Sequence, residues 1–358
     1  MNILHVVDLL SQETGGGSAK VPYYLAREQA KLGHDVTIYS SDYDTKKQLP
    51  PEGVKVVQFH SIHYLFNTWN LTLKMLFADF KSYDIVHLHN YRTIVNLIAG
   101  IKSKNLIFQA HGNCQNINGI TGFIYHLVWR NIVFKRCKGF IADAPLEVSH
   151  YMAEGAMPAD TKVIPVGIDM NGYASLPARN NHSKKQILYL GRMYWIKGPD
   201  LLAKAVALLD RKDIEFVVAS IDFGYEATFR KLINELGIAS ITNMVGPKHG
   251  EEKIQAFIDA DIYVMPSRYE MWGITFMEAL ACGTPVLMTK ECQAWTELPP
   301  YCGLSVNATP KDLARAIDFA LNNKLADKHR AERIEWVRKY DWPAIAKRTV
   351  EYYEKVMG

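Results

Sequence analysis

Two carboxylates stand eight positions apart in the stretch SRYEMWGITFMEALACGTPVL, residues 267–287. Glu270 follows an apolar run, and Glu278 lies in a segment with helical spacing, with Gly273 and Thr275 between them. Free N–H groups at the start of a helix suit a phosphate, whereas a carboxylate accepts hydrogen bonds from hydroxyls and repels a phosphate. The arrangement therefore indicates a ligand with hydroxyls on both sides of its phosphates, such as a nucleotide sugar.

The elements around these carboxylates follow from the apolar pattern. DIYVMPS (261–267) predicts a buried strand, and TFMEALAC predicts a helix that stops at Gly283. Ligands of an open α/β sheet bind at the carboxyl ends of its strands, which is where Glu270 would lie. Thr275 and Glu278 also fit a capping box, which is a purely structural interpretation of Glu278.

A basic motif, GRMYWIKGPDLL (191–202), follows another predicted strand. Arg192 and Lys197 lie in the loop before a helix that we expect to begin near Pro199. Arginine binds a phosphate with a fork of donors and lysine acts as a point charge, so both can neutralise a diphosphate. The alternative is an exposed loop that is basic for no functional reason.

A glycine-rich stretch, TGGGSAK (14–20), follows the first predicted strand. Gly16 and Gly17 permit close approach of a ligand to the backbone, and the next helix adds its N-terminus. The stretch matches neither G-x-G-x-x-G nor a Walker motif, so a plain flexible turn is a competing interpretation.

Two further groups raise the question of a metal. His87, His89 and His111 end two predicted strands, but no carboxylate accompanies them in the same segments. We expect packing rather than metal binding, and His111, which precedes a glycine, is the best placed to face a ligand. The Asp-x-Asp pairs at 42/44 and 259/261 could hold a divalent ion. We interpret the first as a solvated loop and the second as part of a strand turn, and so we expect no metal.

Composition limits the class of protein. The chain has 358 residues, is 48% hydrophobic and carries a net charge of +4, which favours two domains and gives no sign of nucleic-acid binding. From Ile85 to Ala142 there is no Asp or Glu, but seven cations: Arg92, Lys102, Lys104, Arg130, Lys135, Arg136 and Lys138. This basic stretch is either a solvated face or a surface that attracts an anionic substrate or a membrane. Within it, YHLVWRNIVFKRCK (125–138) favours a sheet-covering helix over a membrane-surface helix.

The location of the protein follows from what the sequence lacks. Five cysteines without a C-x-x-C pair argue against a disulfide framework. We see neither a signal peptide nor an uninterrupted apolar run of about 18 residues. We therefore expect a cytoplasmic protein that could work at the inner face of the membrane.

Strand and helix patterns alternate along the whole chain. Strands are predicted near 2–7, 35–40, 54–59, 84–89, 105–110, 139–143 and 161–165, and the pattern restarts at 186–191 after a polar linker. This order predicts an α/β protein with two Rossmann-like domains that face each other across a cleft. We assign residues 1–169 to the N-terminal domain, 170–185 to the linker and 186–340 to the C-terminal domain. Residues 341–358 form a helix that packs back on the N-terminal domain.

The combination of GRMYWIKG, VMPSRYEMWGITFMEALACGTPVL and AHG (110–112) resembles the retaining glycosyltransferases of family 4. The resemblance covers almost the whole chain, including VIPVGID (163–169) at the domain junction. It implies the GT-B fold. It also implies catalytic roles for Glu270, His111, Arg192 and Lys197, and donor binding by Gly16, Gly17, Gly273, Ile274, Thr275 and Glu278.

Each of these roles is what the resemblance implies for the matching position. Glu270 would hold donor-sugar hydroxyls, Glu278 would bind the ribose, and Arg192 and Lys197 would bind the diphosphate. His111 would face the donor sugar. No metal and no cofactor would be required.

The implied reaction transfers a sugar, with retention, from a UDP- or GDP-linked donor to an acceptor hydroxyl. The acceptor would be a glycan, a lipid-linked sugar or a small molecule, in bacterial or archaeal glycan, glycolipid or polysaccharide synthesis. A sugar-nucleotide epimerase of the same fold and a non-catalytic nucleotide-sugar binding subunit are the alternatives. A dinucleotide oxidoreductase fits less well because G-x-G-x-x-G is missing.

Two positions depart from the family pattern. Val166 stands where the family often has Asn, and ECQAWTEL (291–298) stands where it often has a pair of glycines. Cys292, Gln293 and Trp295 would then lie near the donor phosphates, so these departures concern the donor rather than the class of enzyme.

Overall fold

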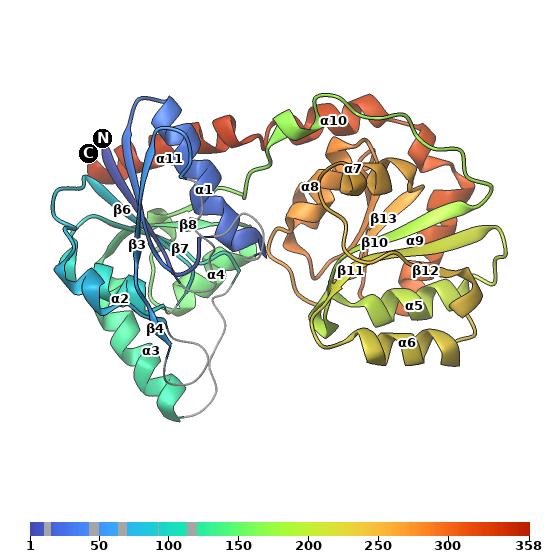
Figure 1. The fold of residues 1–358 in the computed structure, drawn as a ribbon, viewed down its shortest axis with the longest axis horizontal. Helices are drawn as coiled ribbons and strands as arrows, with labels where there is room; N and C mark the ends of the chain where they lie inside the picture. Colours follow the sequence, from blue (N-terminus) through green and yellow to red (C-terminus); the bar gives the residue numbers. More distant parts are fainter. Residues whose placement is uncertain (11–15, 43–49, 64–69, 92, 113–119) are drawn as a thin grey trace. The chain divides into compact units, whose positions relative to one another are not determined.

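The computed structural model describes residues 1–10, 16–42, 50–63, 70–91, 93–112 and 120–358 (Figure 1). They form two compact units. The first consists of Met1–Gly167 together with Trp342–Gly358, and the second of Ile168–Asp341.

The first unit is built on a seven-stranded parallel sheet in the order β3-β2-β1-β6-β7-β8-β9. Its strands are β1 (Asn2–Val7), β2 (Asp35–Ser41), β3 (Val54–Phe59), β6 (Ile85–His89), β7 (Leu106–Gln109), β8 (Cys137–Ala142) and β9 (Thr161–Val163). Its helices are α1 (Gly16–Lys31), α2 (Ile94–Lys102), α3 (Ile120–Ile132), α4 (Pro145–Ala153) and α11 (Trp342–Met357). A short antiparallel pair, β4 (Ile62–His63) and β5 (Asn70–Leu71), stands apart from this sheet.

The second unit is built on a six-stranded parallel sheet in the order β12-β11-β10-β13-β14-β15. Its strands are β10 (Lys185–Met193), β11 (Ile214–Asp222), β12 (Thr242–Met244), β13 (Ile262–Met265), β14 (Val286–Thr289) and β15 (Gly303–Val306). Its helices are α5 (Pro199–Leu208), α6 (Glu226–Glu235), α7 (Gly250–Asp259), α8 (Ile274–Ala281), α9 (Pro310–Asn322) and α10 (Arg330–Arg338).

Both sheets follow the doubly wound pattern, so the predicted α/β fold class with two Rossmann-like domains is confirmed. In each sheet one strand forms the turning point of the strand order. β1 pairs with β2 on one side and β6 on the other, and β10 pairs with β11 and β13. Chain segments leave the sheet in opposite directions at such a point, which opens a place for a ligand at the carboxyl ends of the strands.

The boundary between the units lies between Gly167 and Ile168, inside the VIPVGID segment. The segment 170–185, which the sequence suggested as a linker, belongs to the second unit. Asn180 donates from its backbone N–H and its side-chain amide to Asp259, at 2.8 and 2.9 Å, and Arg179 pairs with Asp261 at 3.0 Å. These bonds tie the segment to the strand turn before β13.

The last helix, α11, belongs to the first unit, where it packs beside α1 (Figure 1). The Trp342 ring stacks on Tyr24 with 5.6 Å between ring centroids, and a Cβ on Gly167 would lie 2.6 Å from that indole. The Tyr353 hydroxyl lies 2.6 Å from Nδ1 of His87 on β6. The first sheet is therefore covered partly by the end of the chain.

Other expectations concern the surface of the protein. The stretch 125–138 includes most of α3, whose Trp129 is completely buried in the first core, so this helix covers the sheet as predicted. In the described parts of the chain, no helix has the length and apolar character that a membrane span needs. Four cysteines, Cys137, Cys282, Cys292 and Cys302, are free thiols.

Candidate active site

The loops that follow β10 and β13 are packed together at the turning point of the second sheet. Gly198 has a left-handed backbone (φ +68°), and a Cβ on it would lie 2.0 Å from the carbonyl oxygen of Pro266. The backbone N–H of Arg268 donates to the carbonyl of Ile196 at 2.8 Å. Only glycine permits this approach, so the sequence K-G-P is what allows the two loops to meet.

Lys197 and Glu270 form an ion pair between these two loops. Their side chains are 18% and 22% exposed, so the pair is shielded but reachable from solvent. The Glu270 backbone is fixed on its other side, because its N–H donates to Glu291 at 3.1 Å and its carbonyl accepts from Gln293 at 2.9 Å. The residue predicted to bind the diphosphate, Lys197, and the residue predicted to bind the sugar, Glu270, thus lie in direct contact.

The start of α8 lies directly after this loop. Gly273 is the residue before the helix, with φ +74°, and no side chain caps the first turn of the helix. A Cβ on Gly273 would lie 3.1 Å from Cγ of Glu270, so the helix start and the carboxylate are close neighbours. The backbone N–H groups near Ile274 and Thr275 are therefore placed as a phosphate site requires.

The capping-box interpretation of Thr275 and Glu278 is wrong. The helix already begins at Ile274, because Gly273 adopts a backbone that other residues rarely adopt, and Thr275 is inside the first turn. Its hydroxyl instead receives a hydrogen bond from the Tyr263 hydroxyl at 2.8 Å. Thr275 thus ties α8 to β13.

Glu278 pairs with a lysine that the sequence analysis did not single out. Nζ of Lys253, on α7, lies 2.6 Å from Oε1 of Glu278, and the glutamate side chain is 13% exposed. Nothing in the local sequence reveals this contact, because α7 and α8 become neighbours only when both pack against the second sheet.

Arg192 occupies the end of β10, one strand position before Met193. Its guanidinium lies over the ring of Phe223, 5.3 Å from the ring centroid, and the residue is exposed to solvent. This places a cation at the same sheet edge as Lys197, open to an anionic ligand.

A second ion pair, which the sequence analysis did not predict, supports the two loops. Arg268 binds Asp200 through two nitrogens, at 2.8 and 2.7 Å, and lies over the Trp195 ring at 4.6 Å. Asp200 is almost fully buried in the first turn of α5. Arg268 therefore holds the two loops together without contacting Lys197 or Glu270 through these bonds.

The first unit places His111 just after β7. His111 has φ +54° and is followed by Gly112 with φ +77°, so the chain turns sharply at the strand end. Its Nε2 lies 3.0 Å from Nδ1 of His89, and its Nδ1 lies 3.3 Å from a carboxylate oxygen of Asp143. Both ring nitrogens are thus bonded within the first unit, and the side chain is only 3% exposed.

The other first-unit expectation concerns Gly16 and Gly17. Both residues are the first of α1, so they occupy the helix start that follows β1. The preceding glycine, Gly15, lies outside the described residues.

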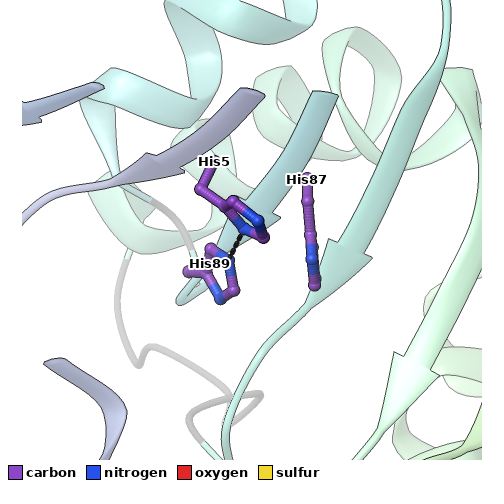
Figure 2. Close-up of side chains that lie close together, drawn as sticks. All are labelled: His5, His87 and His89. Atoms are coloured by element: carbon purple, nitrogen blue, oxygen red, sulfur yellow. Dashed lines mark hydrogen bonds between the residues drawn. The ribbon is translucent and has the colours of Figure 1, made fainter. Parts of the chain in front are cut away.

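The cluster of histidines in the structure differs from the set that the sequence offered as a candidate metal site. The described residues with ligand atoms within 4.8 Å of one another are His5, His87 and His89, not His111 (Figure 2). His5 pairs in register with His87 across β1 and β6, which places them on one face of the sheet. Nδ1 of His5 and Nε2 of His89 are 2.9 Å apart and share a proton, so an ion would have to replace that hydrogen bond.

These three histidines are completely buried, and their pKa values reflect it. Burial lowers the pKa of His5 to about 4, and it holds the pKa values of His87 and His89 well below the usual range. They are neutral at physiological pH. The absence of a metal remains a prediction.

The aspartate pairs have structural partners. Asp259 accepts from Asn180 and Gln255, and a carboxylate oxygen of Asp261 accepts the backbone N–H of Gln186 at 2.8 Å. Asp42 accepts from His60 and from Ser61, whereas Asp44 lies outside the described residues.

The departures from the family pattern are mostly internal. Val166 is buried, and Cys292 is completely buried with its Sγ 3.7 Å from the Trp272 carbonyl. Cys292 pairs with Glu270 as an isolated β-bridge, and burial raises the pKa of its thiol. Cys292 therefore supports the backbone of Glu270 from inside the domain.

Comparison with known proteins agrees with this geometry. Residues 15–171 match the model of "Glycosyltransferase Family 4", and residues 177–340 match that of "Glycosyl transferases group 1". The chain belongs to glycosyltransferase family 4. The glycosyltransferase is 24% identical over 369 residues to an uncharacterized glycosyltransferase of Methanocaldococcus jannaschii, covering 93% of each chain.

Other similarities are partial or structural. D-inositol 3-phosphate glycosyltransferase of Geodermatophilus obscurus is 33% identical over 159 residues, which are 39% of this chain and 34% of that protein. A glycosyltransferase of Rickettsia africae superposes with a TM-score of 0.80 at 19% identity, covering 99% and 98% of the two chains. Anabaena HepE in complex with UDP-glucose superposes with a TM-score of 0.76 at 18% identity, covering 99% and 100%. The fold of the glycosyltransferase is therefore GT-B.

Proposed function

We propose that this glycosyltransferase binds a nucleotide-diphosphate sugar on its second unit and transfers the sugar with retention of anomeric configuration, without a metal ion. The observation that carries the proposal is the Lys197–Glu270 ion pair beside the uncapped start of α8. A cation, a carboxylate and free helix N–H groups together match the phosphates and hydroxyls of one donor.

The ion pair supports a change of partners when the donor binds. Lys197 and Glu270 neutralise each other in the ion pair. A diphosphate carries more negative charge than one carboxylate, so it attracts Lys197 and releases Glu270 to accept hydrogen bonds from sugar hydroxyls. Arg192 and the N–H groups near Gly273 and Ile274 add to the phosphate site, and Glu278 is proposed to bind the ribose.

The chemistry then needs only groups that are present. The bond between the anomeric carbon and the distal phosphate oxygen breaks, and the acceptor oxygen bonds to the same face of that carbon. The acceptor proton passes to the departing phosphate oxygen. Arg192, Lys197 and the helix start stabilise the negative charge that develops on the diphosphate.

The donor and the acceptor are proposed from separate observations. HepE, a structural relative, was solved with UDP and with UDP-glucose, so a UDP-sugar is the donor to test first and a GDP-sugar the second. The stretch from Ile85 to Ala142 has no acidic residue, which supports an anionic acceptor on the first unit. His111, Gly16 and Gly17 of that unit are proposed to act on the donor sugar. Transfer to phosphorylated acceptors, in solution and in anionic vesicles, tests this assignment against uncharged acceptors.

The first experiment is a thermal-unfolding panel with EDTA present. It compares UDP, GDP, ADP, their sugar conjugates and NAD on the wild type, on Arg192→Ala and on the matched control Arg230→Ala, an exposed arginine of α6. A ligand at 100 times its dissociation constant adds about 2.7 kcal/mol to the unfolding free energy. We expect one nucleoside diphosphate to stabilise the wild type and the control but not Arg192→Ala. A response only to NAD, or only after metal addition, contradicts the proposal.

A second experiment tests the reaction. NMR of the product of the active donor and acceptor gives the anomeric configuration, and an inverted product contradicts retention. Conversion of the sugar nucleotide without any acceptor would instead identify an epimerase.

A further inference from the structure

A chain of hydrogen bonds crosses the first unit from α1 to the residue after β8. Oε1 of Gln29 lies 2.7 Å from Nε2 of His5. Nδ1 of His5 lies 2.9 Å from Nε2 of His89, the contact drawn as a dashed line in Figure 2. Nδ1 of His89 lies 3.0 Å from Nε2 of His111, whose Nδ1 faces Asp143 at 3.3 Å. Three imidazoles are therefore connected end to end.

Hydrogen bonds in such a chain must all point in one direction. A neutral imidazole has one donor nitrogen and one acceptor nitrogen, so a bond received at one nitrogen requires a bond donated at the other. His5 and His89 are completely buried, and burial lowers the pKa of each, that of His5 to about 4. Both are neutral, so whether Gln29 donates to or accepts from His5 decides whether His111 donates to or accepts from His89.

The direction at Gln29 is set by the neighbouring His87. The Tyr353 hydroxyl lies between His87 and Gln29, within hydrogen-bond distance of both, and it has one proton to donate. Nδ1 of His87 then accepts from the Tyr353 hydroxyl at 2.6 Å. The Tyr353 oxygen accepts in turn from Nε2 of Gln29 at 3.5 Å, which leaves the Gln29 oxygen to face His5.

His111 is thereby given two protons. His5 donates to Gln29 and accepts from His89, and His89 accepts from Nε2–H of His111. The other nitrogen of His111 faces a carboxylate oxygen of Asp143, which can only accept when it is ionised. Both nitrogens of His111 thus face acceptors, Nδ1 of His89 and the Asp143 carboxylate, an arrangement that only an imidazolium satisfies at both positions.

The charges around His111 balance. Asp143 also accepts from Nε2 of Gln109 at 2.7 Å, so each of its two oxygens faces a nitrogen. The second acid nearby is Glu147, whose oxygens accept the backbone N–H groups of Gly112 and Asp143. Burial and then the Asp143 charge raise the pKa of Glu147 to about 8, so it is mostly neutral at pH 7. In the described part of the chain, the titratable groups around this ring are His5, His87, His89, Asp143 and Glu147.

We propose that His5, His89 and Asp143 are positioning residues that hold His111 as a fixed imidazolium, so that it brings positive charge, and no basic nitrogen, to the carboxyl edge of the first sheet. The role of that charge in sugar transfer rests on the proposed function. The protonation of the ring does not, and it can be measured without any substrate.

The test is ¹⁵N NMR of the full chain labelled at histidine, with His111 identified by the signals that His111→Gln removes. At pH 7 we expect both His111 nitrogens to be protonated in the wild type. In Asp143→Asn and in His89→Phe we expect one of the two His111 nitrogens to be unprotonated. His89→Gln keeps one donor and one acceptor and should preserve the wild-type signals.

Matched controls separate this effect from a loss of structure. His126 and Glu154 form another histidine–carboxylate pair in the same unit, also at 3.3 Å, and Glu154→Gln should leave the His111 signals unchanged. Circular dichroism and thermal unfolding confirm that each variant folds. With the active donor, kcat should fall roughly tenfold to a hundredfold in His89→Phe and recover in His89→Gln, with the KM for the donor within about twofold.

Several results would overturn the inference. A neutral His111 in the wild type is one, and unchanged His111 signals and kcat in both Asp143→Asn and His89→Phe are another. Stoichiometric binding of added Zn²⁺ with joint shifts of His5, His87 and His89 would show a ligand set in place of the chain. If no nucleotide binds at all, the proposed function fails while the NMR result for His111 still stands.

Discussion

Both sheets are doubly wound around one central turning point, and the first has one strand more, but the two turning points are lined with different chemistry. At β1 and β6 the first unit places neutral, fully buried histidines joined by hydrogen bonds. At β10 and β13 the second unit places ion pairs, Lys197 with Glu270 and Arg268 with Asp200. A buried hydrogen-bond chain fixes protonation, whereas a partly exposed ion pair such as Lys197–Glu270 can exchange its partner for a charged ligand. The same architecture thus holds a rigid site in one unit and an exchangeable one in the other.

The largest effect should come from the exchangeable pair. Glu270→Ala removes the carboxylate proposed to hold the sugar, and we expect sugar transfer to fall about a thousandfold, ~4 kcal/mol of transition-state stabilisation. The fold should remain, because Glu270 is a loop residue whose side chain is 22% exposed. The assay is transfer from the active donor, with circular dichroism in parallel.

Glu297→Ala provides the control for this variant, because Glu297 is an exposed carboxylate in the segment after β14. It should transfer sugar at the wild-type rate. Full activity of Glu270→Ala, or its failure to fold, would show that the ion pair serves the structure and not the reaction.

The next effect concerns the contact that brings the two loops of the second unit together. In Gly198→Ala the new Cβ would lie 2.0 Å from the Pro266 oxygen at a left-handed φ of +68°. The strained backbone and the overlap together should lower the unfolding free energy by roughly 3 kcal/mol. Urea unfolding of the purified protein measures this difference.

Gly224→Ala separates the two contributions. Gly224 is also left-handed, at φ +83°, but no atom lies within 4 Å of its Cβ position. This variant should lose only about 1 kcal/mol from backbone strain. Equal losses at both positions would show that the contact with Pro266 adds nothing.

Residues that lie at or directly after the end of a strand could be assigned to the site from the sequence alone. Lys197, Arg192, Glu270 and Gly273 all lie at carboxyl ends of strands that share a sheet, so their assignment to one edge needed only the alternating pattern. The expected fold class followed from the same pattern.

Contacts between residues on different strands could not be predicted, because the sequence does not show which strands pair in the sheet. Lys197 and Glu270 are 73 positions apart and meet because β10 pairs with β13. His5 was missed because it meets His87 only through the β1–β6 pairing. The capping box failed because a single left-handed glycine, Gly273, starts α8 before Thr275.

A change of pH should distinguish the two units. Burial lowers the pKa of His5 from 6.5 to about 4, so the folded protein resists a proton that the unfolded chain accepts near pH 6.5. The stabilisation is complete above pH 6.5 and declines as the pH falls towards 4. The loss from His5 alone is roughly 3 kcal/mol, and His87 and His89 act in the same direction.

Urea unfolding at pH 7.5, 6 and 5 measures this dependence. His5→Gln should flatten the curve, whereas His60→Gln, which removes an exposed histidine, should not. A wild-type unfolding free energy that does not change between pH 7.5 and 5 would argue that these histidines are not buried in neutral form.

The smallest effect should come from the Arg268–Asp200 ion pair of the second unit. Changing it tests whether this pair has only a structural role, in contrast to the Lys197–Glu270 pair. Arg268 contacts Asp200 with two nitrogens and lies on Trp195, and a lysine can reproduce neither the fork nor the stacking. Arg268→Lys keeps the charge, so we expect a loss of about 1–2 kcal/mol in unfolding free energy. The same variant should retain nucleotide-induced stabilisation, because Lys197 and Glu270 are left intact. Loss of nucleotide-induced stabilisation with little loss of unfolding free energy would mean that Arg268 itself binds the donor. The assignment of a structural role to Arg268–Asp200 and a binding role to Lys197–Glu270 would then be wrong.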